Sequence, residues 1–288
     1  MSASAKPVIV ISSHVVRGAV GNRAMVFALE TLGHAVWALP TVILPWHPGH
    51  GPSTRIVPPP DQFAAAIADL AASPWLDEVG AVVSGYLGDE SQAEPVARLV
   101  EAAKRRNPGC LYVCDPVIGD AGGLYVPEAV AAAIRGRLFP MADIATPNRF
   151  EFQWLCGRAL DGNEAIVEAA RHAGPPRMLV TSAHGRAPGE TGNLLASADE
   201  ALLACHRMEP NPPNGLGDLT AALLTAHLLD GQSGRDALRR TTASVAGMAT
   251  LSVAAGLREL PLQAHARALT EPSADIGVGA IAGPEVSG

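Results

Sequence analysis

The sequence predicts a single α/β domain in which a mostly parallel central sheet is covered by helices on both faces. Short β-branched apolar runs alternate with helical segments, as in sheets whose strands are buried on both faces. The 288 residues suffice for one large domain, and no internal repeat or linker divides them. Hydrophobic residues make up 48% and charged residues 17%, so a sizeable core can form and disorder is not expected.

The first part of the chain is predicted to hold four strands and three helices. Gly33 stands at the position where helices commonly end, and Asp61 is expected to cap the second helix. Between the second strand and that helix, residues 44–60 are rich in Pro, Gly and His, which indicates an irregular flap over a site. We expect strands at 8–12, 35–42, 80–84 and 110–114, and helices at 22–32, 63–72 and 91–106.

The second part continues the alternation and ends in helices. A proline at 127 suits the first turn of the next helix, and Asp199-Glu200 can join two strands into a hairpin. We assign the domain to residues 1–270 and expect 271–288, rich in Gly, Ser, Ala and Pro, to form a loose tail. We expect strands at 142–146, 178–181, 192–198 and 202–207, and helices at 127–138, 149–156, 163–172, 219–229, 235–255 and 262–269.

Composition excludes several classes of protein. The net charge is −7 and the Lys and Arg residues are scattered, which argues against a nucleic-acid surface. No apolar run is long enough to span a bilayer, and no signal peptide is visible, so no membrane association is expected. The four cysteines lack the spacing of zinc ligands. Reduced thiols in a cytoplasmic protein are the expected state.

The segment Asn214-Gly215-Leu216-Gly217-Asp218 precedes an apolar helix and carries the main functional signal. Its glycines allow a tight turn with uncovered backbone N–H groups, and the helix adds unpaired amides and the positive end of its dipole. A carboxylate beside such an anion site suits a small-molecule kinase, because it can accept the proton of the hydroxyl that is phosphorylated. A glycine-containing loop with an acidic helix cap is the alternative interpretation of this segment alone.

Polar residues or glycines follow each of the predicted parallel strands except the second. Because ligands of open α/β sheets collect at the carboxyl ends of the strands, this pattern favours a binding site there. The segments are Ser12-Ser13-His14, Ser84-Gly85-Tyr86-Leu87-Gly88, Asp115-Pro116-Val117, Thr146-Pro147-Asn148-Arg149-Phe150-Glu151 and Thr181-Ser182.

Together these segments resemble the ribokinase superfamily, and within it the pyridoxal kinases, over residues 8–270. Ser13-His14-Val15-Val16-Arg17-Gly18 with Val20-Gly21-Asn22 is similar to the amino-terminal signature of vitamin B6 kinases. The remaining blocks follow in the order of the family, and Gly-x-Gly-Asp is shared by the whole superfamily. The resemblance implies ATP-dependent phosphorylation of the 5′-hydroxymethyl group of pyridoxal, with pyridoxine and pyridoxamine as further acceptors.

The resemblance also implies roles for individual residues. Asp218 would be the catalytic base, and the amides of Gly215, Leu216 and Gly217 would hold the charge of the transferred phosphoryl group. Mg²⁺ with ATP is implied, with Asp115 and Glu151 as direct or water-mediated metal ligands, and a monovalent cation such as K⁺. The ATP-binding residues would be Asp115, Thr146, Asn148, Glu151, Thr181, Ser182 and Gly217. Ser13, Val20, His47, Tyr86 and Asp218 would contact the B6 vitamer, and a homodimer is implied.

The flap departs from the family pattern. The family carries Asn-His-Thr-Gly-Tyr where this chain has Trp46-His47-Pro48-Gly49-His50, and Pro48 has neither a hydroxyl nor a backbone N–H to donate. His47 or His50 could contact the vitamer instead. Two alternatives therefore stay open: hydroxymethylpyrimidine phosphorylation in a related fold, and a non-catalytic B6-binding protein. Glu151 as a capping-box partner of Asn148, and Tyr86 as a packing residue, are the structural alternatives at those positions.

Overall fold

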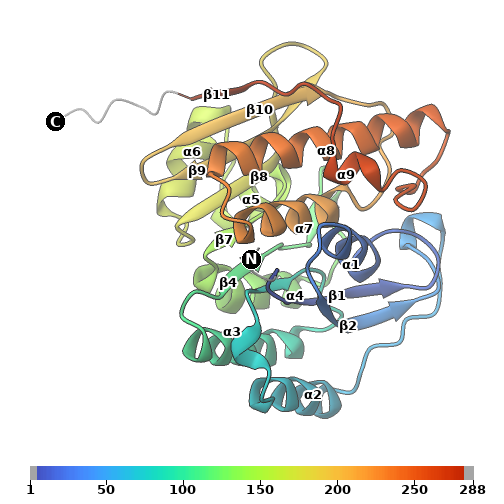
Figure 1. Ribbon diagram of the computed structural model, residues 1–288, viewed down its shortest axis with the longest axis vertical. Coiled ribbons are helices and arrows are strands. Elements are labelled where there is room, and N and C mark those ends of the chain that lie inside the picture. The colour runs from blue at the N-terminus through green and yellow to red at the C-terminus, as the bar shows by residue number, and fades with distance from the viewer. Residues whose placement is uncertain (1–4, 282–288) are drawn as a thin grey trace.

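Nine strands form the central sheet of the computed structural model, which describes residues 5–281 (Figure 1). The sheet order is β11-β10-β9-β8-β7-β4-β3-β1-β2. The strands from β8 to β2 run parallel, whereas β9, β10 and β11 are each antiparallel to their neighbour. Their bounds are β1 Val8–Val15, β2 Val36–Leu44, β3 Ala81–Ser84, β4 Leu111–Cys114, β7 Ile144–Ala145, β8 Arg177–His184, β9 Glu190–Ser197, β10 Ala201–Arg207 and β11 Val278–Ala280.

Helices cover both faces of this sheet, which confirms the predicted fold class. Alternation of side chains along each strand divides the core into two layers: Ile9 and Ile11 of β1 pack on one face, Val8 and Val10 on the other. The face of Ile9 is covered by α2 (Pro60–Ala72), α3 (Ala93–Arg106), α4 (Glu128–Ala133), α5 (Arg149–Cys156) and α6 (Asn163–His172). The face of Val8 is covered by α1 (Asn22–Thr31), α7 (Leu216–Leu229), α8 (Gly234–Ala254) and α9 (Arg267–Thr270).

The first two strands extend beyond the sheet and carry a third, small apolar cluster. The pairing of β1 with β2 shifts between Ser12 and His14, and the strands then continue to Val15 and Leu44. Val15, Val20, Val42 and Leu44 are buried together there. Both strands are longer than predicted because this cluster covers their apolar ends, and the irregular flap therefore begins after Leu44.

Several element boundaries differ from the predictions. The second helix, α2, begins at Pro60, so Asp61 lies in its first turn and is not its cap. Proline is well placed there because its missing N–H has no partner in the first turn of a helix. The predicted helix at 262–269 is reduced to α9, Arg267–Thr270. Short 3₁₀ turns lie at Pro48–His50, Leu76–Glu78, Glu90–Gln92 and Phe139–Met141.

Other features were missed by the sequence analysis. The predicted helix at 127–138 is α4 followed by a π-helical turn, Ile134–Leu138. A two-residue hairpin, β5 (Gly119–Asp120) with β6 (Gly123–Leu124), precedes it. The segment expected to form a loose tail contains β11, which pairs with β10; residues 282–288 lie outside the described part. Within residues 5–281, no helix combines the length and hydrophobicity that crossing a membrane requires.

Candidate active site

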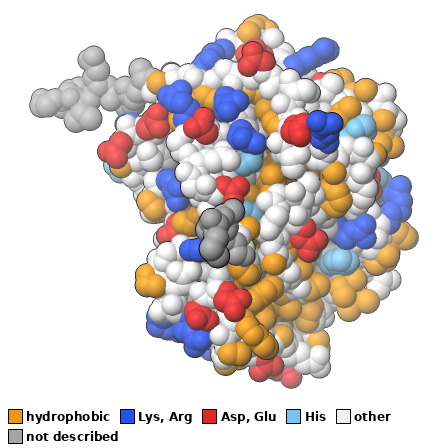
Figure 2. All heavy atoms as spheres, viewed as in Figure 1, with side chains coloured by type: hydrophobic (Ala, Val, Ile, Leu, Met, Phe, Trp, Pro, Cys, Tyr) orange, Lys and Arg blue, Asp and Glu red, His pale blue; other side chains and the backbone are white. Residues whose placement is uncertain are grey.

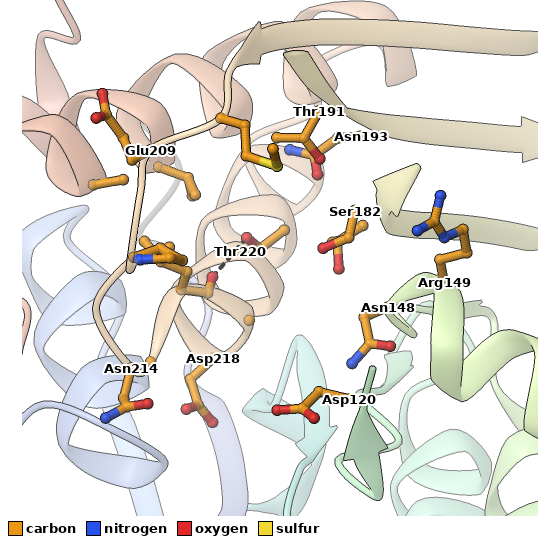
Figure 3. A pocket seen from close by; sticks show the side chains of 18 of the residues that line it. Asp120, Asn148, Arg149, Ser182, Thr191, Asn193, Glu209, Asn214, Asp218 and Thr220 are labelled. Carbon is orange, nitrogen blue, oxygen red and sulfur yellow. Dashed lines mark hydrogen bonds between the residues drawn. The ribbon is translucent and has the colours of Figure 1, made fainter. Parts of the chain in front are cut away.

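A cavity of about 1430 Å³ opens at the carboxyl ends of the parallel strands. The flap, the start of α7 and strands β9 and β10 complete its walls. Figure 3 shows lining side chains of α7, such as Asp218, and of β9, such as Asn193. Its volume exceeds the roughly 300–1,000 Å³ typical of a pocket for one small ligand, so it has room for two. All the predicted site residues line it: Ser13, Val20, His47, Tyr86, Asp115, Thr146, Asn148, Glu151, Thr181, Ser182, Gly215, Leu216, Gly217 and Asp218.

The two glycines before Asp218 have different reasons to be glycine. Gly215 caps α7 with φ 92°, and a Cβ there would overlap the carbonyl oxygen of Ala19. Gly217 is the second residue of α7, has no left-handed backbone angle, and faces space with no heavy atom within 4 Å of a Cβ. The expectation that both glycines form the turn is therefore wrong for Gly217. The first N–H groups of α7, from Leu216 to Asp218, lack helical partners because of their position.

Asp218 stands beside these amides as the third residue of α7. Its carboxyl group points into the cavity, between Asn214 and Asp120 (Figure 3). Burial raises the pKa of Asp218 to about 6, and the backbone N–H of Gly21 acts in the opposite direction. A carboxylate with a pKa near neutrality is a better proton acceptor than an ordinary aspartate. The arrangement thus combines a base with an anion site.

Asp115 follows β4 and is 4% exposed. Its Oδ1 accepts a hydrogen bond of 2.9 Å from the Thr146 hydroxyl, while the buried Oδ2 has no partner among the described residues. Burial, and then the nearby charge of Asp218, raise the pKa of Asp115 to about 8, against the hydrogen bond from Thr146. A buried carboxyl oxygen without a partner is costly, so this atom marks a place for a cation or a donor.

Glu151 is 3% exposed, and its carboxylate accepts three backbone N–H groups from two segments of the chain. Its Oε1 accepts from the N–H groups of Ile118 and Gly119 at 3.0 and 3.3 Å, and its Oε2 accepts from Asn148 N–H at 2.8 Å. The Asn148 side chain in turn accepts from Glu151 N–H, which completes a capping box for α5. Burial and the charge of Asp115 raise the pKa of Glu151. The carboxylate thus fixes the loop after β4 against the start of α5.

Thr181 and Ser182 lie at an irregularity near the end of β8. The pairing of β8 with β9 shifts between Val180 and Ala183, and Ser182 has a φ of 53°. Thr181 N–H donates to the carbonyl of Pro147 at 2.9 Å, which ties this segment to the one before α5. Ser182 is exposed and lines the cavity near Asn148 (Figure 3).

The flap side of the cavity is less charged. Ser13 is 7% exposed, and a Cβ at Gly21 would collide with it, so the two segments touch. Tyr86 packs beside the small apolar cluster of β1 and β2, and its N–H donates to Ser12 Oγ at 3.1 Å. His47 Nδ1 accepts from Gly49 N–H at 3.1 Å. Burial, and then the neighbouring His50, lower the pKa of His47, so its ring is neutral at pH 7.

A carboxylate from the loop after α8 holds the flap. Glu259 Oε1 lies 2.8 Å from His50 Nε2 and 3.3 Å from Arg17 Nη1, and its Oε2 accepts from Ala19 N–H at 3.0 Å. One side chain thereby connects the flap, the segment after β1 and the carboxyl-terminal loop. This connection joins segments about 200 residues apart along the chain, so no local sequence pattern could reveal it.

The cavity includes residues that the sequence analysis did not assign. Arg149 lies between Asn148 and Glu151, which were both assigned to the site, so this motif could have pointed to Arg149 as well. The others come from loops whose position depends on the fold. They include Asp120, Tyr125, His184, Asn193 and His206.

Comparisons with known proteins agree with this geometry. Residues 54–263 match the family model described as phosphomethylpyrimidine kinase. The chain is 38% identical over 269 residues to the pyridoxal kinase PdxY of Rubrobacter xylanophilus, covering 91% of this chain and 93% of that protein. It is 37% identical to PdxY of Granulibacter bethesdensis, with coverage of 91% and 96%. The pyridoxal kinase of Leishmania donovani in complex with ADP and pyridoxamine superimposes with a TM-score of 0.90 at 27% identity, covering 96% of this chain and 100% of that one.

Proposed function

The chain belongs to the pyridoxal kinases of the ribokinase-like superfamily, and from this premise we propose that it transfers the γ-phosphoryl group of ATP to the 5′-hydroxymethyl group of pyridoxal. The observation that carries the proposal is the carboxyl group of Asp218, with its raised pKa, beside the free amides of α7. The cavity volume supports two ligands at once. ADP and pyridoxamine in the Leishmania donovani complex support a nucleotide and a B6 vitamer as those ligands.

Asp218 would accept the proton of the acceptor hydroxyl as that oxygen attacks phosphorus. The N–H groups of Leu216, Gly217 and Asp218 would stabilise the charge that develops on the transferred group, with the helix dipole of α7 adding to them. The acceptor would lie on the flap side, among Ser13, Val20, His47 and Tyr86. The nucleotide would lie toward Asn148, Thr181 and Ser182, whose side chains offer neutral donors to phosphate oxygens.

Mg²⁺ would enter with ATP, and the residues present fit it. Asp115 offers a buried carboxyl oxygen that has no partner in the described part of the protein, the kind of hard ligand that Mg²⁺ takes together with substrate phosphates and water. Glu151, whose oxygens already accept three backbone N–H bonds, would act through water and Thr146 through Asp115. The ion would neutralise phosphate charge near these acids. We include a monovalent cation such as K⁺ in the proposal on the resemblance alone.

Substrate profiling tests the proposal. ADP release should be measured with MgATP and pyridoxal, pyridoxine, pyridoxamine or hydroxymethylpyrimidine as acceptor. We expect turnover with pyridoxal. Because Pro48 cannot donate a hydrogen bond to the vitamer, the order of activity among the three vitamers is an informative result. Turnover with the pyrimidine alone would replace this proposal by the pyrimidine kinase. No MgATP-dependent product at saturating pyridoxal would favour a non-catalytic B6-binding protein.

The pH dependence should report the base. Asp218 must be deprotonated to accept a proton, and burial places its pKa at about 6. We therefore expect kcat/KM for pyridoxal to fall as the pH drops through about 6, because the pKa is raised above that of an ordinary aspartate. An initial-rate profile between pH 4.5 and 8 at constant ionic strength measures this. A profile that stays flat down to pH 4.5 would contradict the role of Asp218.

The flap connection gives a further prediction. Glu259→Gln would remove the charge that holds Arg17 and His50, while leaving an acceptor for Ala19 N–H. We expect KM for pyridoxal to rise about 2- to 5-fold with little change in kcat, since ion pairs near a protein surface contribute about 0.2–1 kcal/mol. Steady-state kinetics measure it. Glu271→Gln is the matched control, because the one ion pair of Glu271 within residues 5–281 is with Arg267 on the surface; equal effects of both variants would refute the flap role.

We also propose that the enzyme works in the cytoplasm as a homodimer. The homodimer rests on the family resemblance alone, and the cytoplasmic location rests on the reduced state expected for the cysteines. Light scattering coupled to size-exclusion chromatography measures the oligomeric state, and a mass of one chain at working concentration would contradict the dimer.

A further inference from the structure

The cavity is poor in positive charge for a site that takes a polyphosphate. The six acidic side chains that line it are Asp115, Asp120, Glu151, Glu190, Glu209 and Asp218. The chain has only two lysines, Lys6 and Lys104, and neither lines the cavity. Arg149 and Arg186 are the permanently charged cations among the described lining residues. Protein cations for the phosphates must come from these two arginines.

Arg186 is already engaged. Its Nη2 donates to the carbonyl oxygen of Leu203 at 3.4 Å, and the guanidinium packs so closely on Gly279 that a Cβ there would overlap it. These contacts hold the group against β10 and β11, at the edge of the sheet.

Arg149 is in the opposite situation. It has no carboxylate within 4.0 Å in the part of the chain that the structure describes. It is also the first residue of α5, where the positive end of the helix dipole disfavours a cation. A half-buried cation that lies in the unfavourable field of a helix, with no counter-ion among the described residues, is suited to bind an anionic ligand.

The position of Arg149 is fixed by its neighbours. Its Nη1 lies 3.1 Å from both ring nitrogens of His184, and because a guanidinium only donates, the ring nitrogen that lacks a proton is the acceptor. The backbone of His184 is held by Asn163, which accepts from its N–H at 3.0 Å and donates to its carbonyl at 2.8 Å. Figure 3 shows Arg149 beside Ser182 and Asn148, on the far side of the cavity from Asn214 and Asp218.

We propose that Arg149 binds the phosphates that stay with the nucleotide, and so neutralises the charge of the leaving diphosphate. This inference rests on the proposed function. Since the transferred phosphoryl group belongs beside Asp218 and the amides of α7, a cation across the cavity faces the remaining phosphates. A guanidinium can donate two parallel hydrogen bonds to phosphate oxygens, which a lysine cannot.

Calorimetric titration with MgADP, MgATP and adenosine tests this on the full chain. Arg149→Gln should weaken binding of MgADP and MgATP by about 10-fold or more, as expected for loss of a charge-assisted hydrogen bond, and leave adenosine within about 2-fold. The affinity of Arg149→Lys for MgADP and MgATP should lie between those of Arg149→Gln and wild type. Arg158→Gln is the matched control at the other end of α5, where the arginine pairs with Glu168 on the surface; it should bind all three ligands as wild type does.

Unchanged MgADP affinity in Arg149→Gln would overturn the inference, and so would an equal loss for adenosine, which would indicate displacement of the nucleotide site as a whole. Thermal melting confirms that the variants are folded. Because these titrations need no acceptor, they separate the two proposals. Wild type that binds MgADP through Arg149 but does not phosphorylate pyridoxal would refute only the proposed function. Pyridoxal turnover with unchanged nucleotide affinity in the variant would refute only the role of Arg149.

Discussion

Replacing Asp218 with asparagine is expected to lower kcat for pyridoxal phosphorylation by at least ~10², while pyridoxal affinity changes little. Asparagine has the shape of aspartate and keeps an acceptor oxygen, but its amide cannot take up the proton of the attacking hydroxyl. Asp218 also lies in the first turn of α7, where a neutral side chain costs only a few tenths of a kcal/mol of helix stability. The effect of this substitution on catalysis can therefore be measured with little change in the stability of the fold.

The measurement is single-turnover phosphorylation at saturating MgATP, with pyridoxal affinity obtained by titration. Asp161→Asn, at an exposed position between α5 and α6, is the matched control and should retain wild-type rates. A variant at Asp218 that keeps wild-type turnover would show that another group is the base. A large loss of pyridoxal affinity with unchanged turnover would instead make Asp218 a binding residue.

Gly217→Val is expected to reduce turnover by at least ~10² without lowering the melting temperature by more than a few degrees. Apart from the adjoining backbone of α7, no atom of the described residues lies within 4 Å of a Cβ at this position, and the backbone is in an ordinary helical conformation, so valine can be accommodated in the fold. Its side chain would, however, project into the space beside Asp218 where the transferred phosphoryl group must approach the amides of α7. The loss would be specific to the reaction.

Comparison with Gly215→Ala makes this prediction sharper. A Cβ at Gly215 would overlap the Ala19 carbonyl in a left-handed backbone conformation, so this variant should lose stability as well as activity. If the assignment is correct, turnover falls in both variants, but the melting temperature falls clearly only in Gly215→Ala. A Gly217→Val enzyme that remains active would place the phosphoryl group elsewhere.

Part of the fold could be predicted because it depends on local patterns. The limits of α5 and α6 were obtained within a residue, since Asn148 with Glu151 forms a capping box and Gly157 ends α5 in the left-handed conformation. The alternation of short apolar runs with helical segments also predicted the parallel strands. The hairpin β5–β6 and strand β11 were missed, because two or three residues carry too little periodicity and are held by pairing with distant strands.

The candidate site divides in the same way. Asp115, Thr146, Asn148 and Glu151 could be placed at the ends of strands from the sequence pattern, and the family resemblance implied their roles. How these roles are divided among them could not be predicted. Only the tertiary structure shows that Glu151 accepts three backbone N–H groups, while one oxygen of Asp115 has no partner among the described residues. Likewise, the motif contained Arg149, but the role proposed for it depends on the lack of a nearby counter-ion within residues 5–281, which is a property of the packed cavity.

By itself the sequence determined the class of fold, the family and the identity of the residues at the ends of the strands, because these depend on short-range periodicity and on contiguous motifs. Tertiary structure alone decided how these residues act. It gathered Asp115 after β4, Glu151 of α5 and Asp218 of α7 around one cavity, where burial raises the pKa of each, and it brought Glu259 to the flap across most of the chain. Desolvation and charge proximity depend on distances through space, and those distances are not contained in any local stretch of sequence.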